Sequence, residues 1–152
     1  AKHVILHLFS GPDHNYWDQR CANANTEVLC IDTTCSTPAN LHDRNVFGYL
    51  LTLCASGRVR AILGGPPRRT VSALRYQNDE GPGVLRTEEH PYGLPTLSPA
   101  DAELVIADSV LMFRFWSLLM VAEEMREETE PPTQFFMEQP EDPKRYRSEA
   151  DV

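Results

Sequence analysis

A loop of unusual stiffness follows a short apolar run and has the residue types of a binding site. The run, residues 59–63, contains the β-branched Val59 and Ile62, and residues 64–72 then read Gly-Gly-Pro-Pro-Arg-Arg-Thr-Val-Ser. Proline fixes φ at about −65°, and glycine lets a ligand approach the backbone closely. Because open α/β sheets bind ligands at the carboxyl ends of their strands, this loop is a candidate ligand site. An ordinary turn that ends a strand is the alternative.

A second candidate site combines a glycine turn with a carboxylate. The apolar run at residues 3–9 leads into Gly11, and a second run, residues 27–32, ends in Asp32. An acid about twenty residues after such a turn can accept hydrogen bonds from both hydroxyls of a ribose. The alternative is a helix cap within residues 32–34. The dinucleotide fingerprint Gly-x-Gly-x-x-Gly is absent, which argues against NAD.

The loop at residues 64–72 resembles the catalytic loop of cytosine-C5 DNA methyltransferases, whose pattern is Gly-Gly-Pro-Pro-Cys-Gln-x-Phe-Ser. The positions that fall on this pattern are Gly64, Gly65, Pro66, Pro67 and Ser72. Arg68 stands where the family has its nucleophilic cysteine. Methyltransferase-like segments of eukaryotic retroelement polyproteins are a closer likeness, because they share the run Thr-Val-Ser-Ala-Leu-Arg-Tyr at residues 70–76.

Two further motifs carry the same resemblance. Residues 8–11, Leu-Phe-Ser-Gly, are similar to the family's first motif, which wraps the methionine part of S-adenosylmethionine. Glu138 ends the run Gln-Phe-Phe-Met-Glu and is similar to the family's Glu-Asn-Val motif, whose Glu holds the target cytosine. Gln139 and Pro140 replace Asn and Val here. For Glu138 the alternative is a strand-end carboxylate that faces solvent.

The resemblance implies S-adenosylmethionine as cofactor. The residues expected to hold it are Phe9, Ser10, Gly11, Asp32, Asp43, Gly64 and Pro66. In Rossmann-type methyltransferases an acid at the position of Asp43 bonds the adenine amino group, although an acid there is equally explained as a helix N-cap. The residues expected to face nucleic acid are Arg68, Arg69, Ser72 and Arg75.

Arg68 places the family's chemistry in question. In that chemistry a thiolate adds to C6 of cytosine before C5 takes the methyl group, and a Glu supports the ring nitrogen. Arginine stays protonated and has no lone pair to offer a carbon atom. Arg68 and Glu138 therefore occupy the catalytic positions, with the nucleophile substituted. Enzymes that methylate exocyclic amines carry Asp/Asn/Ser-Pro-Pro-aromatic at this loop, and Gly65 and Arg68 fit that pattern poorly.

The hydrophobic pattern predicts an α/β fold with a doubly wound, mostly parallel sheet. The pattern supports strands near residues 3–9, 27–32, 59–64 and 134–138, and the resemblance helps to place one more near residues 39–42. Helices are expected at residues 16–24, from Asp43 to about 56, and from Ser98 to about 128, the last with its core face at Leu104, Leu111, Phe115, Leu118, Ala122 and Met125. A Gly- and Pro-rich loop should fill residues 73–97. The resemblance implies the Rossmann-like order 3-2-1-4-5, a methyltransferase-like domain at 1–143 and a polar tail at 144–152.

Composition sets further bounds. The chain has 152 residues, 41% of them hydrophobic, which is enough for one domain with one core. A net charge of −8 argues against nucleic-acid binding by the whole surface, but arginines gather around the Pro-Pro loop: Arg58, Arg60, Arg68, Arg69, Arg75 and Arg86. The four cysteines show no Cys-x-x-Cys pair and are interpreted as reduced thiols of an intracellular protein, nuclear or cytoplasmic, without a metal site. Residues 110–122 are apolar but too short to span a bilayer, and no membrane partner is expected.

Three functional interpretations remain open. The first is a domain that binds S-adenosylmethionine and is either catalytically silent or altered at one position of an active design. The second is a non-enzymatic module in which Arg68 and Arg69 contact phosphate and the fold serves nucleic-acid binding or assembly. The third is an active transferase on another acceptor. DNA is the expected partner of an active form, with a further domain or chain to recognise the target. Because the chain begins without Met, a longer parent protein is one interpretation.

Overall fold

The computed structural model describes residues 2–12, 20–35, 37–76 and 82–138 of the chain. These residues belong to two compact units. Unit 1 contains Ala1–Pro66 and Leu111–Glu138, and unit 2 contains Pro67–Val110 among the described residues. The helix α3, Pro99–Glu124, contributes its first half to unit 2 and its second half to unit 1.

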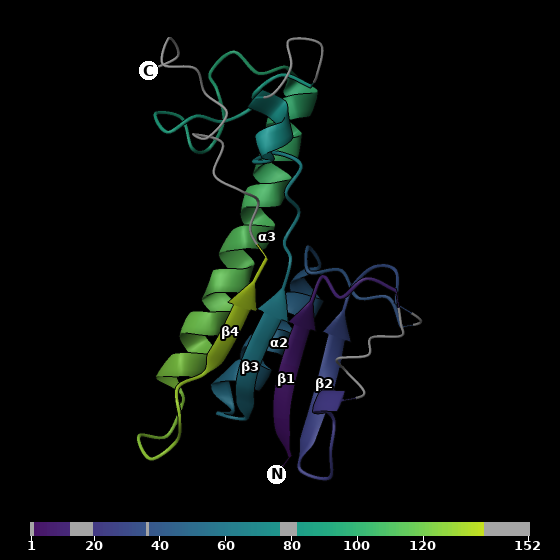
Figure 1. Cartoon of the computed structure of the whole chain (residues 1–152), viewed down its shortest axis with the longest axis vertical. Helices are drawn as coiled ribbons and strands as arrows, with labels where there is room; N and C mark the ends of the chain where they lie inside the picture. Colours follow the sequence, from purple (N-terminus) through teal and green to yellow (C-terminus); the bar gives the residue numbers. More distant parts are fainter. Residues whose placement is uncertain (1, 13–19, 36, 77–81, 139–152) are drawn as a thin grey trace. The chain divides into compact units, whose positions relative to one another are not determined.

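Unit 1 is an α/β structure with a four-stranded sheet in which all strands are parallel (Figure 1). The strands are β1 (His3–Leu8), β2 (Thr26–Ile31), β3 (Val59–Gly64) and β4 (Gln134–Met137), in the order β2-β1-β3-β4. This order matches the expected one for four of the five strands. Parallel strands place their carboxyl ends at one edge of the sheet, so the turns after β1, β2 and β3 begin there and β4 ends there.

The strand expected at residues 39–42 does not form, and that prediction was wrong. These residues make a turn in which the Asn40 side chain accepts from the backbone N–H of His42 at 2.9 Å. The N–H of Asp43 donates to the carbonyl of Asn40 at 2.9 Å. Local bonds of this kind take the backbone groups that a sheet ladder would need, so Leu41 alone enters the core, at 3% exposure.

Capping explains where the two long α-helices begin. α2 (Arg44–Ala55) starts after Asp43, whose carboxylate accepts from the N–H of Asn45 at 2.7 Å. α3 starts after Ser98, whose hydroxyl oxygen accepts from the N–H of Asp101 at 3.1 Å and donates to its carboxylate at 2.7 Å. Both starts agree with the sequence, while α3 ends at Glu124 rather than near 128. Of the helix expected at 16–24, residues 16–19 lie outside the described residues. Residues 20 and 21 are helical, whereas Asn23 forms an isolated bridge with Thr26 instead.

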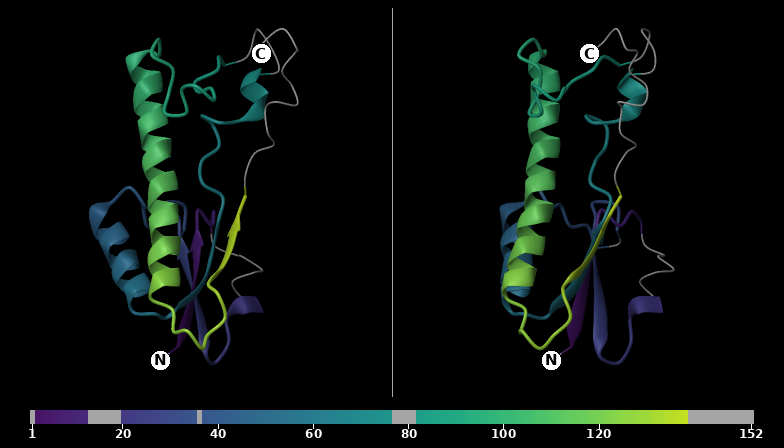
Figure 2. Two further views of the ribbon diagram at one scale, coloured as in Figure 1. Left: turned by 90° about the vertical axis from the view of Figure 1, so that its left-hand side faces the viewer. Right: turned by 60° about the vertical axis from the view of Figure 1, so that its left-hand side comes forward.

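The core of unit 1 lies between the sheet and its helices. α2 and the second half of α3 lie on the same face of the sheet (Figure 2). The buried side chains on this face are Val4, Leu6, Leu8, Ile31, Leu41, Leu50, Cys54, Val59, Ile62, Leu111, Phe115, Leu118 and Ala122. Burial raises the pKa of the Cys54 thiol to about 12, so the thiol stays protonated and packs as an apolar group.

The expected core face of α3 is confirmed in its second half, where Leu111, Phe115, Leu118 and Ala122 are buried. Leu104 is half-buried, and Met125, which follows the helix, is 48% exposed. By length and composition alone α3 would be able to cross a bilayer, unlike the shorter run considered from sequence. That is weak evidence for a membrane span, because the core helix of a soluble protein meets the same criterion.

Candidate functional site

The turn after β1 is strained and is tied to the end of β2. Phe9 has φ 57°, a left-handed conformation that non-glycine residues seldom adopt, and Gly11 has φ 76°. The Phe9 N–H donates to the carbonyl of Ile31 at 2.8 Å. The Gly11 N–H donates to Asp32 Oδ2 at 3.0 Å. Strain of this kind persists where the surroundings fix the backbone and is concentrated at ligand sites.

The carboxylate of Asp32 joins this turn to the loop that follows β2. Its Oδ1 accepts from the Thr34 N–H at 2.8 Å and from the Thr34 hydroxyl at 2.6 Å. Partial burial alone would raise the pKa of Asp32, but hydrogen bonds from Thr34, Gly11 and Thr33 outweigh it and lower the pKa. Asp32 therefore caps a turn rather than a helix, and it is ionised at neutral pH.

Cys35 is a member of this site that sequence reasoning missed. Its thiol is 7% exposed, donates to the carbonyl of Gly11 at 3.2 Å and lies 3.4 Å from the hydroxyl of Ser10. The Cys35 thiol thus bonds the carbonyl of Gly11, while Asp32 accepts from the N–H of the same glycine. The only available signal was its place three residues after Asp32 in the same loop.

Asp43 performs the capping role that the sequence allowed for it. Its Oδ1 accepts from the Asn45 N–H, and its backbone carbonyl accepts from Arg114 of α3 at 3.4 Å. Arg114 also donates to the carbonyl of Leu41 and stacks 4.8 Å from the centre of the Phe47 ring. The turn before α2 is therefore fixed from α3, a tether that the sequence did not predict.

The structure brings Glu138 against the glycines of the Pro-Pro loop. The Glu138 N–H donates to the carbonyl of Gly64 at 3.0 Å. A Cβ added to Gly65 would lie 3.2 Å from Glu138 Oε2, so the carboxylate packs directly over this glycine. A Cβ on Gly64 would lie only 2.5 Å from the carbonyl oxygen of Leu8. Two motifs more than seventy residues apart in sequence therefore meet at the carboxyl edge of the sheet.

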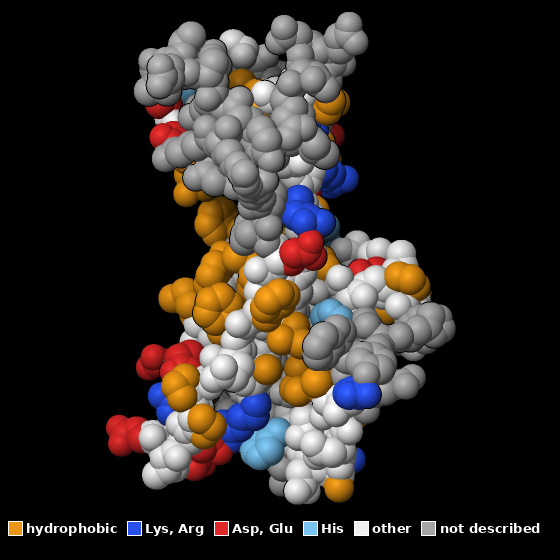
Figure 3. Space-filling view, viewed as in Figure 1, with side chains coloured by type: hydrophobic (Ala, Val, Ile, Leu, Met, Phe, Trp, Pro, Cys, Tyr) orange, Lys and Arg blue, Asp and Glu red, His pale blue; other side chains and the backbone are white. Residues whose placement is uncertain are grey.

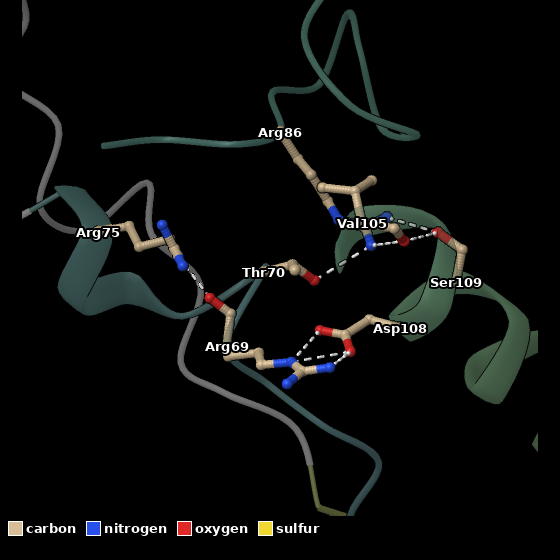
Figure 4. Close-up of polar contacts among 7 residues, drawn as sticks. All are labelled: Arg69, Thr70, Arg75, Arg86, Val105, Asp108 and Ser109. Carbon is tan, nitrogen blue, oxygen red and sulfur yellow. Dashed lines mark hydrogen bonds and ion pairs between the residues drawn. The ribbon is translucent and has the colours of Figure 1, made fainter. Parts of the chain in front are cut away.

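In unit 2, Arg69 is paired with a carboxylate (Figure 4). Its Nη2 lies 2.9 Å from Oδ1 of Asp108, and its Nε also donates to that carboxylate. Asp108 is 4% exposed. Arg75 donates to the carbonyls of Arg69 and Gly83, while Arg68 is exposed. The Arg69 charge is thus offset within the chain, and a phosphate would have to compete with Asp108 for it.

Arg86 holds the long loop to α3 in the same unit (Figure 4). Its guanidinium donates to the carbonyl of Val105 at 2.9 Å and to the hydroxyls of Thr70 and Ser109, each at 3.1 Å. Partial burial lowers the pKa of Arg86, and the negative charge of Asp108 opposes that shift. As expected, the described part of residues 73–97 is a loop, apart from the short helix η1 (Ala73–Tyr76).

Glu138 belongs to unit 1 and Arg68 to unit 2, so the catalytic pairing expected from sequence stays a prediction. The same holds for the expected contacts of Ser72 and Arg75 with nucleic acid. Comparisons of the chain with known protein families, with curated proteins and with solved structures found no match.

Proposed function

We propose that unit 1 binds S-adenosylmethionine as a methyltransferase-like domain related to cytosine-C5 DNA methyltransferases, with Arg68 at the position of the nucleophile. The resemblance of three motifs motivates the proposal. The strand order β2-β1-β3-β4 supports it, because that order fits a Rossmann-like sheet with its switch point between β1 and β3.

The observation that carries the proposal is the bond between Gly11 and Asp32. It joins the turn after β1 to the turn after β2, at the carboxyl edge of a parallel sheet, where such folds receive nucleosides. The lowered pKa of Asp32 keeps its carboxylate negative at neutral pH, so it acts as a hydrogen-bond acceptor. The neighbouring turn holds two left-handed residues, Phe9 and Gly11, and strained backbone of this kind is concentrated at ligand sites.

The donors already present limit how a ribose would bind. A carboxylate offers roughly four acceptor positions, and the hydrogen bonds from Gly11, Thr34 and the Thr33 backbone use them. A ribose hydroxyl would therefore bind Asp32 only by displacing one of these donors. Both hydroxyls were expected from sequence to share this carboxylate, so the geometry favours a narrower role for Asp32.

Glu138, together with Gly64 and Pro66 of unit 1, would face the methyl end of the cofactor. S-adenosylmethionine supplies an electrophilic methyl group when bound, and Glu138 would hold a proton or a hydrogen bond at a ring nitrogen of an acceptor base. The Arg68 guanidinium cannot supply the electron pair that a thiolate gives. We therefore expect cofactor binding without methyl transfer to C5 of cytosine.

Calorimetry with S-adenosylmethionine and its demethylated product tests the proposal. Wild type should bind, and Asp32→Asn should weaken binding at least tenfold, because a lost hydrogen bond to a charged group costs about 1.5–3 kcal/mol. Glu27→Gln is the matched control, since Glu27 is an exposed acid at the other end of β2. Its affinity should equal that of wild type.

Two outcomes would count against the proposal. If wild type showed no measurable affinity, S-adenosylmethionine would not be its cofactor, and the non-enzymatic interpretation would be favoured. Fluorescence anisotropy with labelled single-stranded DNA would then test that interpretation. Equal affinity of wild type and Asp32→Asn, with both variants folded by circular dichroism, would place the ribose elsewhere.

A further inference from the structure

β4 has the composition of an interior strand but lies at the edge of the sheet. Within the described residues it pairs with β3 on one side, and no strand pairs with its other side (Figure 1). Successive residues of a strand point to opposite faces. Phe135 and Phe136 are nevertheless both apolar, and they are 53% and 65% exposed. Apolar residues on both faces are typical of strands that are covered on both faces, and exposed apolar edges pair readily with another chain.

The register of β4 shows which of its backbone groups point outward. The Glu138 N–H donates inward to the carbonyl of Gly64. Because backbone donors alternate along a strand, the N–H groups of Phe135 and Met137 point away from β3. Phe135 also contacts Trp116 of α3, with ring centroids 5.9 Å apart, so Phe135 and Met137 lie on the helix-covered face and Phe136 lies on the opposite face.

We propose that a second copy of this chain adds to β4 by antiparallel pairing of the two β4 strands, centred on Phe136. A two-fold axis through this residue sets Phe135 of each copy opposite Met137 of the other. The outward N–H and C=O groups of both residues then bond across the axis. Phe136 faces the same residue of the second copy at a position without hydrogen bonds, where side chains lie closest. The strand is thus complementary to itself in backbone bonds and in side chains.

An apolar stripe on α3 extends this surface beside the strand. Phe113, Trp116 and Met120 follow one another at helical spacing and are 55%, 37% and 70% exposed. They lie away from the face that carries Phe115 and Leu118 into the core. Figure 3 shows hydrophobic side chains gathered on the part of the surface where β4 and α3 lie in Figure 1.

The exposed area fits a dimer. Aromatic side chains bury about 150–250 Å² each, so the exposed parts of the five side chains of β4 and the α3 stripe amount to roughly 500 Å² per copy. A stable interface buries about 800 Å² per partner, of which about 65% is apolar in homodimers. The two quantities agree, and a two-fold dimer is the arrangement in which the same patch serves both copies.

A disulfide test addresses the register. In the proposed dimer Phe136→Cys places two thiols opposite each other with Cβ atoms about 4.5–5.5 Å apart, close to disulfide range. Mild oxidation should yield a covalent dimer in which mass spectrometry finds residue 136 joined to residue 136. Phe135→Cys is the matched control, because its sulfur would face Met137 of the second copy and not the second cysteine. Equal cross-linking of the two variants, or none in either, would overturn the register.

Sedimentation velocity from 1 to about 100 µM tests the association itself. Wild type should sediment as a dimer at the upper concentrations, and Met120→Glu should raise the dissociation constant at least 100-fold. Tyr49→Glu is the control, since Tyr49 is 61% exposed on α2, outside the patch, and it should dimerise like wild type. A wild type that stays monomeric throughout would overturn the proposal, and so would equal weakening by Met120→Glu and Tyr49→Glu.

Discussion

At the residue scale, the first glycine of the Pro-Pro loop has a steric role that can be measured. A Cβ on Gly64 would lie 2.5 Å from the Leu8 carbonyl oxygen and 3.1 Å from the Phe115 ring. Neither group can yield easily, because Leu8 and Phe115 are fully buried. Gly64→Ala should therefore lower the free energy of unfolding by about 3 kcal/mol, the upper part of the usual range for overpacking.

Gly48 is the matched control for that measurement. It lies inside α2, and nothing stands within 4 Å of an added Cβ. Gly48→Ala should raise the free energy of unfolding by about 0.5–1 kcal/mol, because alanine favours the helix. Urea unfolding of both variants checks the pair. If Gly64→Ala were as stable as wild type, a glycine would not be needed beside β1 at this position.

The residues that sequence predicted best are those whose role follows from local spacing. The turn at Gly11 and the acid at Asp32 lie where their spacing indicated, and the structure joins them. The sequence did not predict the roles of Cys35, Asp108 and Arg114, because each of them contacts a partner that only the fold brings near. Asp108 pairs with Arg69 across 39 positions, and Arg114 bonds the carbonyl of Leu41 across 73.

At the scale of elements, capping and apolar periodicity predicted both described helices and four strands. The short strand expected at residues 39–42 does not form because Asn40 and Asp43 bond the backbone locally, and two apolar residues, Ala39 and Leu41, are too few to select a strand. The prediction of that strand also drew on the resemblance. A strand or helix of a similar family can be expected in this chain only where the local sequence is able to form it.

Asp108 offers a test of how the long loop is held in unit 2. Asp108→Asn leaves the partly buried guanidinium of Arg86 without the nearby negative charge and removes the ion pair with Arg69. The loop should then open more often, so the amide of Leu94, which donates to the carbonyl of Leu85 at 3.0 Å, should exchange with deuterium at least tenfold faster.

Glu103→Gln is the control for that exchange experiment, since Glu103 is an exposed acid of the same helix and the same unit. It should leave the exchange of Leu94 unchanged. Equal exchange in wild type and Asp108→Asn would mean that the bonds of Arg86 to Thr70, Ser109 and the backbone hold the loop without a counter-charge.

At the scale of the whole molecule, the composition indicated one core and an acidic surface. It did not indicate that the edge strand of the sheet would expose apolar side chains. Residues 134–138 were expected as the fifth strand, and β4 forms there. Its two exposed phenylalanines are apolar, which is what pattern reasoning uses to predict a buried strand. The pattern cannot distinguish a strand covered by its own chain from one that a second copy would cover.

The net charge of the chain predicts the direction in which salt should change the dissociation constant of the proposed dimer. Each copy carries a formal charge of −8 at pH 7, so two copies repel one another at low ionic strength. The proposed contacts are apolar side chains and backbone bonds, which salt does not screen, whereas the repulsion is screened within about 10 Å at 0.1 M. Raising sodium chloride from 50 to 500 mM should therefore lower the dissociation constant several-fold in sedimentation velocity. An interface made of ion pairs would respond in the opposite direction, so weakening by salt would contradict pairing through Phe135, Phe136 and Met137.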